Sequence, residues 1–188
     1  MVGPTVNPDP TGLVSLVPLH KTHAVEDFSC GREPLDAFLK KYALIGPPQG
    51  LSQTWVAVSG SGQVLGYYTL GASAIRCGDA SARVTKGMPR YDIPVVLLAR
   101  LAIDISVQGR GLGRTILLEA MRKAVALGRL PLVPDGEPGL PLRAMLVHAL
   151  DDQASAFYRH FGFERSPTDP LHLMMLLKDI EAVLLTAK

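Results

Sequence analysis

The sequence predicts a mixed α/β fold, in which a central mixed sheet is flanked by helices. Apolar residues recur with strand-like spacing in some segments and with helical spacing in others, and the two kinds of segment alternate along the chain. The sheet is expected to begin antiparallel, because two β-branched runs follow each other across a short turn of small residues. Hydrophobic residues make up 47% of the 188 residues, which is enough for a sizeable core without disulfides or metals.

The N-terminal part is predicted to hold one strand and one helix. Residues 1–12 are rich in Pro and Gly, so we expect a flexible lead-in there, followed by a single domain over residues 13–188. Residues 13–18 alternate in polarity like a strand. Residues 33–44 carry apolar side chains at helical spacing, and Pro34 suits the first turn of a helix.

The middle of the chain is predicted to be mostly strands. Residues 54–58 and 64–70 are separated by small turn residues and predict an antiparallel hairpin. A loop with several basic residues follows between Arg76 and Asp92. Residues 94–104 then form a nearly continuous apolar run, which is typical of a central strand covered on both faces.

The C-terminal part alternates between helices and strands. A helix is predicted over residues 111–127, an exposed Pro-rich insertion over 130–141, and a strand over 144–149. The next helix begins at Asp151 or Asp152 and ends before Gly162, which favours a left-handed conformation. A last strand over 171–177 and a short helix over 179–187 complete the chain.

Composition and charge exclude several classes of protein. No apolar run reaches the ~18 residues that a membrane span needs, and the N-terminus does not resemble a signal peptide, so we expect a cytoplasmic protein without a membrane partner. Cys30 and Cys77 are isolated, which argues against a disulfide framework or a zinc ribbon, and no metal site is expected. The net charge of +2 is too small to indicate nucleic-acid binding by itself.

The most informative segment is the glycine-rich turn over residues 108–114, Gln-Gly-Arg-Gly-Leu-Gly-Arg. It lies between a strong strand and a strong helix, where free backbone N–H groups and the helix dipole favour an anion such as a pyrophosphate. The spacing does not match a P-loop, which needs GxxxxGK followed by Ser or Thr. It also lacks the GxGxxG spacing of a dinucleotide fingerprint.

The pattern Gln-x-x-Gly-x-Gly at this turn resembles the acyl-coenzyme A loop of the GNAT acetyltransferase superfamily. The preceding residues 100–104 are similar to that family's fourth strand, and residues 156–163 are similar to its late A-x-FY-x-x-x-GF motif. The order and spacing of these motifs match over residues 50–178. The resemblance implies a GNAT-like fold whose two parallel strands, here residues 99–105 and 144–150, splay apart to admit the pantetheine of acetyl-CoA.

The resemblance also assigns residues to the cofactor. Main-chain groups of the strand would contact the acetyl group and the pantetheine, and the turn would hold the pyrophosphate; the residues implied are Leu101, Ala102, Ile103, Gln108, Gly109, Arg110, Gly111, Gly113 and Arg114. No metal is implied.

Tyr158 is the candidate general acid. The resemblance places it next to the cofactor sulfur, where a phenol of pKa near ~10 can protonate a thiolate leaving group. Phe157 and Phe161 are spaced as i and i+4, so we expect them to anchor the helix in the core while Tyr158 points elsewhere. His148 is a weaker candidate, because a histidine at the end of a strand is more often simply hydrogen-bonded.

A narrower resemblance connects the chain to the toxin branch of this superfamily. It is carried by Phe28-Ser29-Cys30-Gly31 and by residues 35–39, 65–70, 147–149 and 166–170. It implies acetylation of the α-amino group of aminoacyl-tRNA, which blocks translation, and inhibition by a ribbon-helix-helix antitoxin. The basic residues expected to contact tRNA are Arg76, Arg83, Lys86 and Arg90, with Lys40 and Lys41 as an extension.

Two other functions stay open at this point. The chain could acetylate a small amine or a protein N-terminus, or it could be a catalytically silent acyl-CoA-binding module. The presence of both the turn glycines and Tyr158 argues against a silent module. The preferred amino acid, the general base and a homodimeric assembly are not determined by the sequence.

Overall fold

The computed structural model describes residues 5–6, 14–45, 52–129 and 141–186. The chain divides into two compact units: unit 1 comprises Met1–Gly71 and Ala99–Glu119, and unit 2 comprises Ala72–Leu98 and Ala120–Lys188. Strands β4 (Val64–Ile75) and β5 (Ile93–Ile103) and helix α3 (Leu112–Arg129) each contribute residues to both units. The division therefore does not follow the order of the sequence, and a single domain over residues 13–188 stays a prediction.

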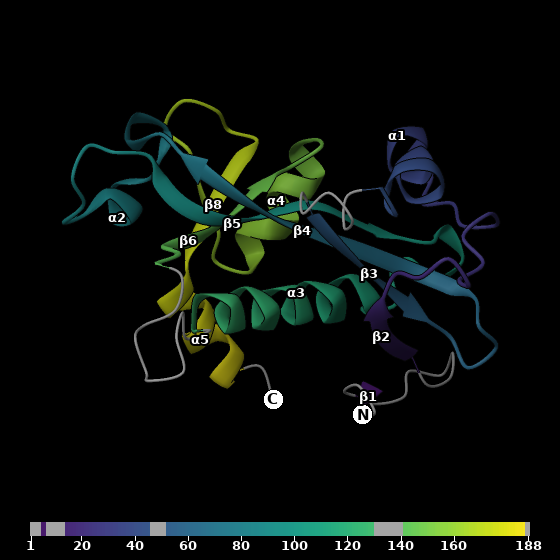
Figure 1. Cartoon of the computed structure of the whole chain (residues 1–188). Helices are drawn as coiled ribbons and strands as arrows, with labels where there is room; N and C mark the ends of the chain where they lie inside the picture. Colours follow the sequence, from purple (N-terminus) through teal and green to yellow (C-terminus); the bar gives the residue numbers. More distant parts are fainter. Residues whose placement is uncertain (1–4, 7–13, 46–51, 130–140, 187–188) are drawn as a thin grey trace. The chain divides into compact units, whose positions relative to one another are not determined.

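Unit 1 contains an antiparallel meander. Strands β1 (Thr5–Val6), β2 (Val14–Pro18), β3 (Ser52–Val58) and β4 pair in that order (Figure 1). The predicted hairpin is confirmed. Residues Thr5 and Val6 lie within the expected flexible lead-in and pair with Ser15 and Val14, a contact that the Pro-rich composition did not indicate.

The helical segment of unit 1 differs from its prediction. Instead of one α-helix over residues 33–44, the chain forms α1 (Glu33–Ala37) and then a π-helical turn over Phe38–Tyr42. The wider turn adds a residue and breaks the i, i+3, i+4 spacing. Leu39 and Tyr42 were both predicted to lie on the apolar face: Leu39 is 1% exposed, as predicted, whereas Tyr42 is 56% exposed.

The core of unit 1 lies between this helical segment and the meander. Its buried members come from the loop before α1, from the helical turn, from β3 and β4, and from the end of β5: Leu19, Phe28, Cys30, Leu39, Ala43, Val56, Val58, Val64, Tyr67 and Ala102.

Unit 2 contains the parallel pair that the sequence predicted. Strand β5 pairs in parallel with β6 (Ala144–His148) over Val95–Leu98, and β6 pairs antiparallel with β8 (His172–Leu176), which also pairs with the short β7 (Glu164–Arg165) (Figure 1). The sheet is thus mixed, as predicted. Residues 144–147 belong to the paired stretch, although they fall in the range expected to splay; β5 continues to Ile103, and β6 ends at His148.

Unit 2 also contains the helices α2, α4 and α5. The predicted basic loop contains a short helix, α2 (Ala82–Thr85). Helix α4 (Asp152–His160) is capped by the Asp151 side chain, and Gly162 after it has φ 94°, as predicted. Helix α5 (Leu177–Thr186) follows β8. The predicted Pro-rich insertion lies outside the described residues except at its end. Among the described helices, none is long and apolar enough to cross a membrane.

Candidate active site

The loop that follows β5 is organised by Asp104, which is 4% exposed. Its carboxylate accepts hydrogen bonds from the Ser106 hydroxyl at 2.6 Å, from the Ser106 backbone N–H at 3.0 Å and from the Ser29 backbone N–H at 3.0 Å. Burial acts to raise the pKa of Asp104, but these hydrogen bonds outweigh it and hold that pKa below its ordinary value. A charged Asp104 therefore fixes the chain where it leaves the strand.

The side chain of Gln108 supports the same loop. Its amide nitrogen donates to the carbonyl oxygens of Ile103 at 2.9 Å and Cys30 at 3.0 Å. Sequence reasoning placed Gln108 among the pyrophosphate contacts. In the structure, its amide hydrogens bind the protein backbone, so the residue shapes the turn as well.

The glycines of the turn differ in backbone conformation. Gly109 and Gly111 have φ values of 75° and 87°, which side-chain-bearing residues rarely adopt. A Cβ atom at either position would meet nothing within 4 Å, so the backbone faces open space there. Gly113 has no positive φ and lies in the first turn of α3.

This turn has the features of an anion site. The first N–H groups of a helix lack intrahelical partners, and α3 begins at Leu112 with its dipole directed at the turn. Arg110 and Arg114 are exposed on either side of Gly111. An open glycine backbone, a helix N-terminus and two cations suit a pyrophosphate, so the residues present fit acetyl-CoA.

Sequence reasoning missed the residues that brace this loop from the other side. The carboxylate of Asp36 accepts from the Cys30 backbone N–H at 2.8 Å and from the Ser29 hydroxyl at 3.1 Å. Burial, and then Asp36, raise the pKa of the Cys30 thiol to about 11, so the thiol stays protonated. The motif at residues 28–31 was noted for its resemblance to the toxin branch. Nothing in its spacing indicated that the Ser29 backbone N–H binds Asp104, 75 positions away.

The strand residues expected to bind the acetyl end also lie in unit 1. Ala102 is 5% exposed, whereas Leu101 and Ile103 are half-buried. Next to them on β4, Gly66 leaves no room for a side chain: a Cβ would lie 3.0 Å from the Ala102 carbonyl oxygen and 2.7 Å from Ile116 Cδ1. Gly66 therefore lets β4 pack closely against the end of β5.

Tyr158 lies in unit 2 on α4 and is 6% exposed. Its ring packs edge-on against Phe157 at 5.3 Å and Phe163 at 5.8 Å. Burial raises the pKa of Tyr158 well above its ordinary value, which keeps the phenol neutral and able to donate a proton.

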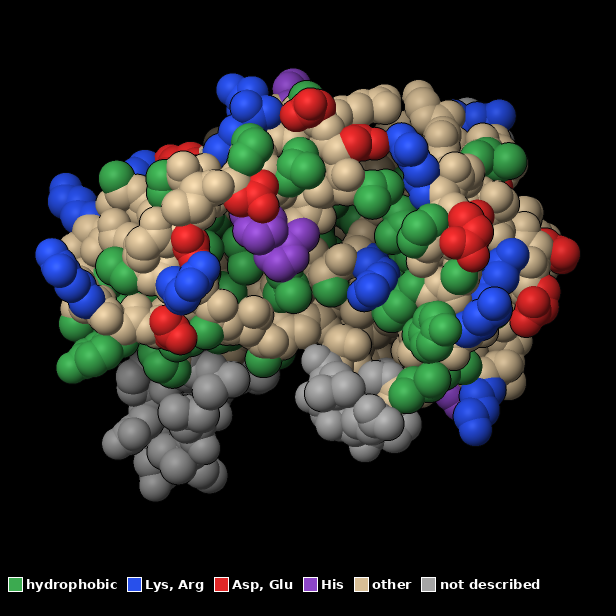
Figure 2. Space-filling model, turned by 90° about the horizontal axis from the view of Figure 1, so that it is seen from above, with side chains coloured by type: hydrophobic (Ala, Val, Ile, Leu, Met, Phe, Trp, Pro, Cys, Tyr) green, Lys and Arg blue, Asp and Glu red, His purple; other side chains and the backbone are tan. Residues whose placement is uncertain are grey.

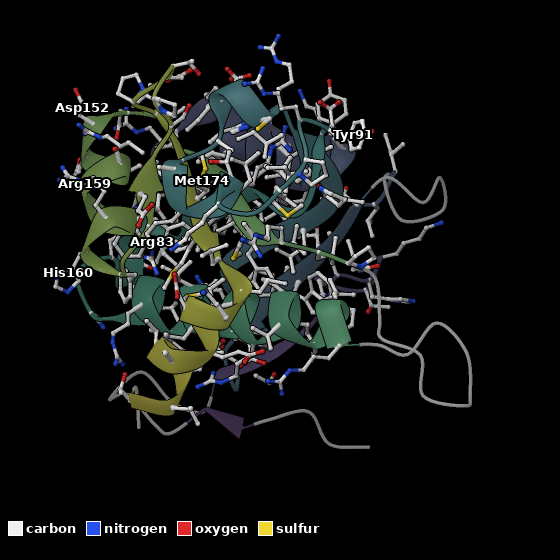
Figure 3. The ribbon with its side chains drawn as sticks, turned by 90° about the vertical axis from the view of Figure 1, so that its left-hand side faces the viewer. Arg83, Tyr91, Asp152, Arg159, His160 and Met174 are labelled. Atoms are coloured by element: carbon white, nitrogen blue, oxygen red, sulfur yellow. The ribbon has the colours of Figure 1, made fainter. Side chains whose placement is uncertain are left out.

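The expectation for its neighbours was wrong. Phe157 and Phe161 do contact each other, at 5.1 Å, but both are only half-buried. The buried face of α4 instead carries Ser155 and Tyr158, which are three residues apart and so share one side of the helix. The other side is exposed, and Asp152, Arg159 and His160 project outward from it (Figure 3).

His148 at the end of β6 has an unexpected partner. Its ring stacks on that of His172, its register partner on β8, with centroids 4.0 Å apart and planes at 20°. The His172 Nε2 atom is 3.4 Å from Asp169 Oδ2. Figure 2 shows histidine side chains (purple) gathered at one place on this face of the molecule. Burial, and then His172, hold the pKa of His148 below its ordinary value. Among the described residues, no cluster of His, Cys, Asp or Glu has the arrangement of a metal site.

The four predicted tRNA contacts fall into two pairs. Arg76 binds Asp79 at 2.7 Å, and Arg83 binds both Asp179 at 2.7 Å and Glu164 at 3.0 Å. Arg83 thereby reaches from α2 to β7 and α5, beside Met174 of β8 (Figure 3). Lys86 and Arg90 are exposed and, within the described ranges, form no ion pair.

These features define the class of protein. A family model described as an acetyltransferase (GNAT) domain matches residues 50–165, more than half of the chain. The chain therefore belongs to the GNAT acetyltransferase family, which agrees with the mixed sheet and with the glycine turn that joins β5 to α3.

Several proteins similar to this chain are toxins. A protein described as a tRNA-acetylating toxin, from Mycobacterium tuberculosis (strain ATCC 25618 / H37Rv), is 45% identical over 160 residues, which is 85% of this chain and 90% of that protein. A tyrosine-to-phenylalanine mutant of KacT superposes with a TM-score of 0.80 at 28% identity, covering 90% of this chain and 98% of the other.

AtaT complexed with acetyl-methionyl-tRNAfMet has a TM-score of 0.77 at 28% identity, with the same coverage of 90% and 98%. Further structures of this toxin are of AtaTR bound with AcCoA, with a TM-score of 0.71 at 26% identity, and of a mutant bound to the C-terminus of the antitoxin AtaR.

Proposed function

We propose that the chain transfers the acetyl group of acetyl-CoA to the α-amino group of aminoacyl-tRNA and thereby acts as a toxin that blocks translation in the cytoplasm. The observation that carries this proposal is the 45% identity to a tRNA-acetylating toxin over 85% of the chain. The open glycine turn and the neutral Tyr158 supply the chemistry that such a transfer needs.

Acetyl-CoA supplies the acetyl thioester, and the turn residues hold its pyrophosphate. Gly109, Gly111 and Gly113 offer backbone N–H groups, Arg110 and Arg114 add charge, and Gln108 keeps the turn in shape. Leu101, Ala102 and Ile103 provide main-chain groups for the pantetheine and the acetyl carbonyl. The substitution Gly111→Asp tests this assignment, because the new carboxylate would repel the pyrophosphate.

The transfer forms one C–N bond and breaks one C–S bond. The neutral amine of the acceptor attacks the thioester carbonyl carbon, and the thiolate leaves. Tyr158 would donate its phenolic proton to that thiolate, and the proton released by the new amide returns to solvent, from which Tyr158 is reprotonated. Burial suits Tyr158 to this role because it prevents ionisation before the reaction.

The acceptor would approach the exposed cations of unit 2. Lys86 and Arg90 are the better candidates for phosphate contacts, because they are exposed and form no ion pair within the described ranges. Arg76 and Arg83 would have to share their charge with the carboxylates that they already bind. A ribbon-helix-helix antitoxin is the proposed protein partner, on the analogy of the toxins that resemble this chain.

The direct test is incubation with radiolabelled acetyl-CoA and a pool of charged tRNAs. Label in aminoacyl-tRNA supports the proposal, and expression of the wild-type chain alone should then arrest growth. Label that enters polyamines or peptide amines but never aminoacyl-tRNA overturns it in favour of a small-substrate or protein acetyltransferase. Calorimetry with Gly111→Asp checks the cofactor half separately: acetyl-CoA affinity should fall at least tenfold.

A further inference from the structure

Arg100 is a cation in unit 1 that sequence reasoning did not single out. It lies on β5, directly before the segment 101–103 that is proposed to bind the acetyl end of the cofactor. Its guanidinium carbon lies 3.7 Å from the centroid of the Phe38 ring. Among the ion pairs of the described residues, none involves Arg100.

The structure holds Arg100 in place before any ligand arrives. Phe38 is itself stacked on Tyr67, with centroids 6.2 Å apart and planes at 25°. Tyr67 is fully buried, and its hydroxyl donates to the Leu35 carbonyl oxygen at 2.8 Å. The ring under the guanidinium is therefore fixed by the core, which lowers the conformational entropy that Arg100 would lose on binding an anion.

The π-helical turn that carries Phe38 also carries two lysines and an exposed aromatic. Lys40 and Lys41 form no ion pair among the described residues, and Tyr42 is 56% exposed. The backbone N–H of Ala43 donates to the Phe38 carbonyl oxygen at 2.9 Å, which closes the wide turn. Such turns occur often at functional sites, and here the turn exposes Tyr42, which a regular helix would place on its apolar face.

Cations beside an accessible aromatic ring are the usual means of binding single-stranded nucleic acid. The cations contact phosphates, and the ring stacks on a base whatever its identity. Arg100 adds a planar, preorganised guanidinium that suits a phosphate better than a lysine does. Unit 1 thus combines a cation held against an aromatic ring, two lysines without an ion pair among the described residues, and an exposed aromatic ring.

We infer that Arg100, Lys40, Lys41 and Tyr42 form a binding site for the single-stranded 3′ end of the acceptor tRNA. This inference rests on the proposed function, in which the aminoacyl ester at that end must reach the acetyl group next to Leu101. Arg100 and the lysines bind the terminal phosphates, and Tyr42 stacks on a base. The site is separate in sequence from Lys86 and Arg90, which would bind the body of the tRNA.

The experiment compares two RNA probes: uncharged full-length tRNA, and the same tRNA trimmed of its unpaired 3′ nucleotides. Filter binding is measured for the wild type, Arg100→Ala, Arg100→Lys, the pair Lys40→Ala with Lys41→Ala, and Tyr42→Ala. Lys21→Ala is the matched control, since it removes one exposed lysine of the same unit. Thermal unfolding and acetyl-CoA calorimetry accompany each variant.

The wild type should bind full-length tRNA about tenfold more tightly than trimmed tRNA. Arg100→Ala and the double lysine variant should lose that difference, Arg100→Lys should lose part of it, and Lys21→Ala none. The slope of log affinity against log salt for full-length tRNA should fall by about 0.7 per lost phosphate contact. The affinity for acetyl-CoA should not change, because these side chains do not belong to the glycine turn.

Variants that distinguish the two probes as well as the wild type does would overturn the inference. So would an equal loss of acetyl-CoA affinity, which would make Arg100 a cofactor residue. Arg100→Lys keeps the test valid if Arg100→Ala unfolds. Acetylation of charged tRNA by the wild type separates the two hypotheses: if it occurs and the variants bind normally, only the 3′-end site is wrong, and if it never occurs, the proposed function fails first.

Discussion

The side-chain amide of Gln108 donates a hydrogen bond to the backbone carbonyl of Cys30, 3.0 Å away and 78 positions earlier in the sequence. The same nitrogen donates to the carbonyl of Ile103. A single side chain therefore connects the end of β5, the glycine turn and the loop before α1. We therefore expect the shape of the proposed pyrophosphate site to depend on this side chain.

Gln108→Glu tests that dependence. The substitution replaces the donor nitrogen with a carboxylate oxygen that faces two carbonyl oxygens, so unfolding free energy should fall by about 1–3 kcal/mol. Acetyl-CoA affinity measured by calorimetry should fall with it. Gln63→Glu is the control, because Gln63 is exposed and its side chain has no hydrogen bond to another described residue. If Gln108→Glu binds acetyl-CoA like the wild type, the side chain does not shape the site.

Gly66→Ala should destabilise unit 1. The new methyl group would lie 3.0 Å from the backbone carbonyl oxygen of Ala102 and 2.7 Å from Ile116 Cδ1, and a backbone atom cannot move aside cheaply. We expect a loss of about 1–3 kcal/mol in chemical denaturation. Gly60→Ala, where a Cβ meets nothing within 4 Å, should change the stability by less than about 0.5 kcal/mol. Equal effects at the two glycines would contradict the close approach of β4 and β5.

Tyr158→Phe should slow acetyl transfer by about 10²–10⁴, the usual effect of removing a general acid. The ring and its contacts with Phe157 and Phe163 stay, so folding and acetyl-CoA affinity should be nearly unchanged. Tyr91→Phe, at a 75% exposed position, is the matched control. Steady-state kinetics that show wild-type turnover in a folded Tyr158→Phe protein would assign Tyr158 to the core alone.

The rate of the wild type should also show no alkaline limb from Tyr158 below pH ~10. Burial raises the pKa of this phenol, so the proton-donating form persists at a higher pH than for a free tyrosine. A pH–rate profile that falls between pH 8 and 9 and loses that fall in Tyr158→Phe would show that the phenol ionises there.

His148 should titrate below the ordinary histidine pKa of 6.5. Burial disfavours its charge, and the stacked His172 disfavours it further, whereas Asp169 favours it to a smaller extent. Protonation of His148 therefore costs more in the folded than in the unfolded protein, and stability should be lost as the pH falls below about 6.5. In NMR titrations, His172→Gln should raise the pKa of His148; an unchanged pKa would mean that burial alone depresses it.

The cations of unit 2 should contribute unequally to tRNA affinity. Replacing Lys86 and Arg90 by Ala should weaken binding and lower its salt dependence, because both charges are unpaired among the described residues. Replacing Arg76 and Arg83 by Ala should have a smaller effect, since each already binds a carboxylate. Filter binding at several salt concentrations makes the comparison, and a larger loss from the second pair would reverse this order.

The sequence by itself determined most of the strands and helices and the position of the glycine-rich turn. Local patterns carried these predictions, because each depends on neighbours within a few residues. Examples are the apolar run of β5, the glycines at 109, 111 and 113, and the helix caps at Asp151 and Gly162. The motif order over residues 50–178 likewise indicated the GNAT family, which the match over residues 50–165 confirms.

Only the tertiary structure decided what those residues contact. Four contacts join positions that are remote in sequence. They are the hydrogen bond from Gln108 to Cys30, the two ion pairs of Arg83, the stacking of His148 on His172 and the cation–π contact of Arg100 with Phe38. The π-helical turn that exposes Tyr42 and the burial of Tyr158 ahead of Phe157 were likewise decided by packing. Spacing along a chain predicts the face of a side chain only where the helix or strand is regular, as it is not at Tyr42. The partner of a side chain depends on how distant segments meet.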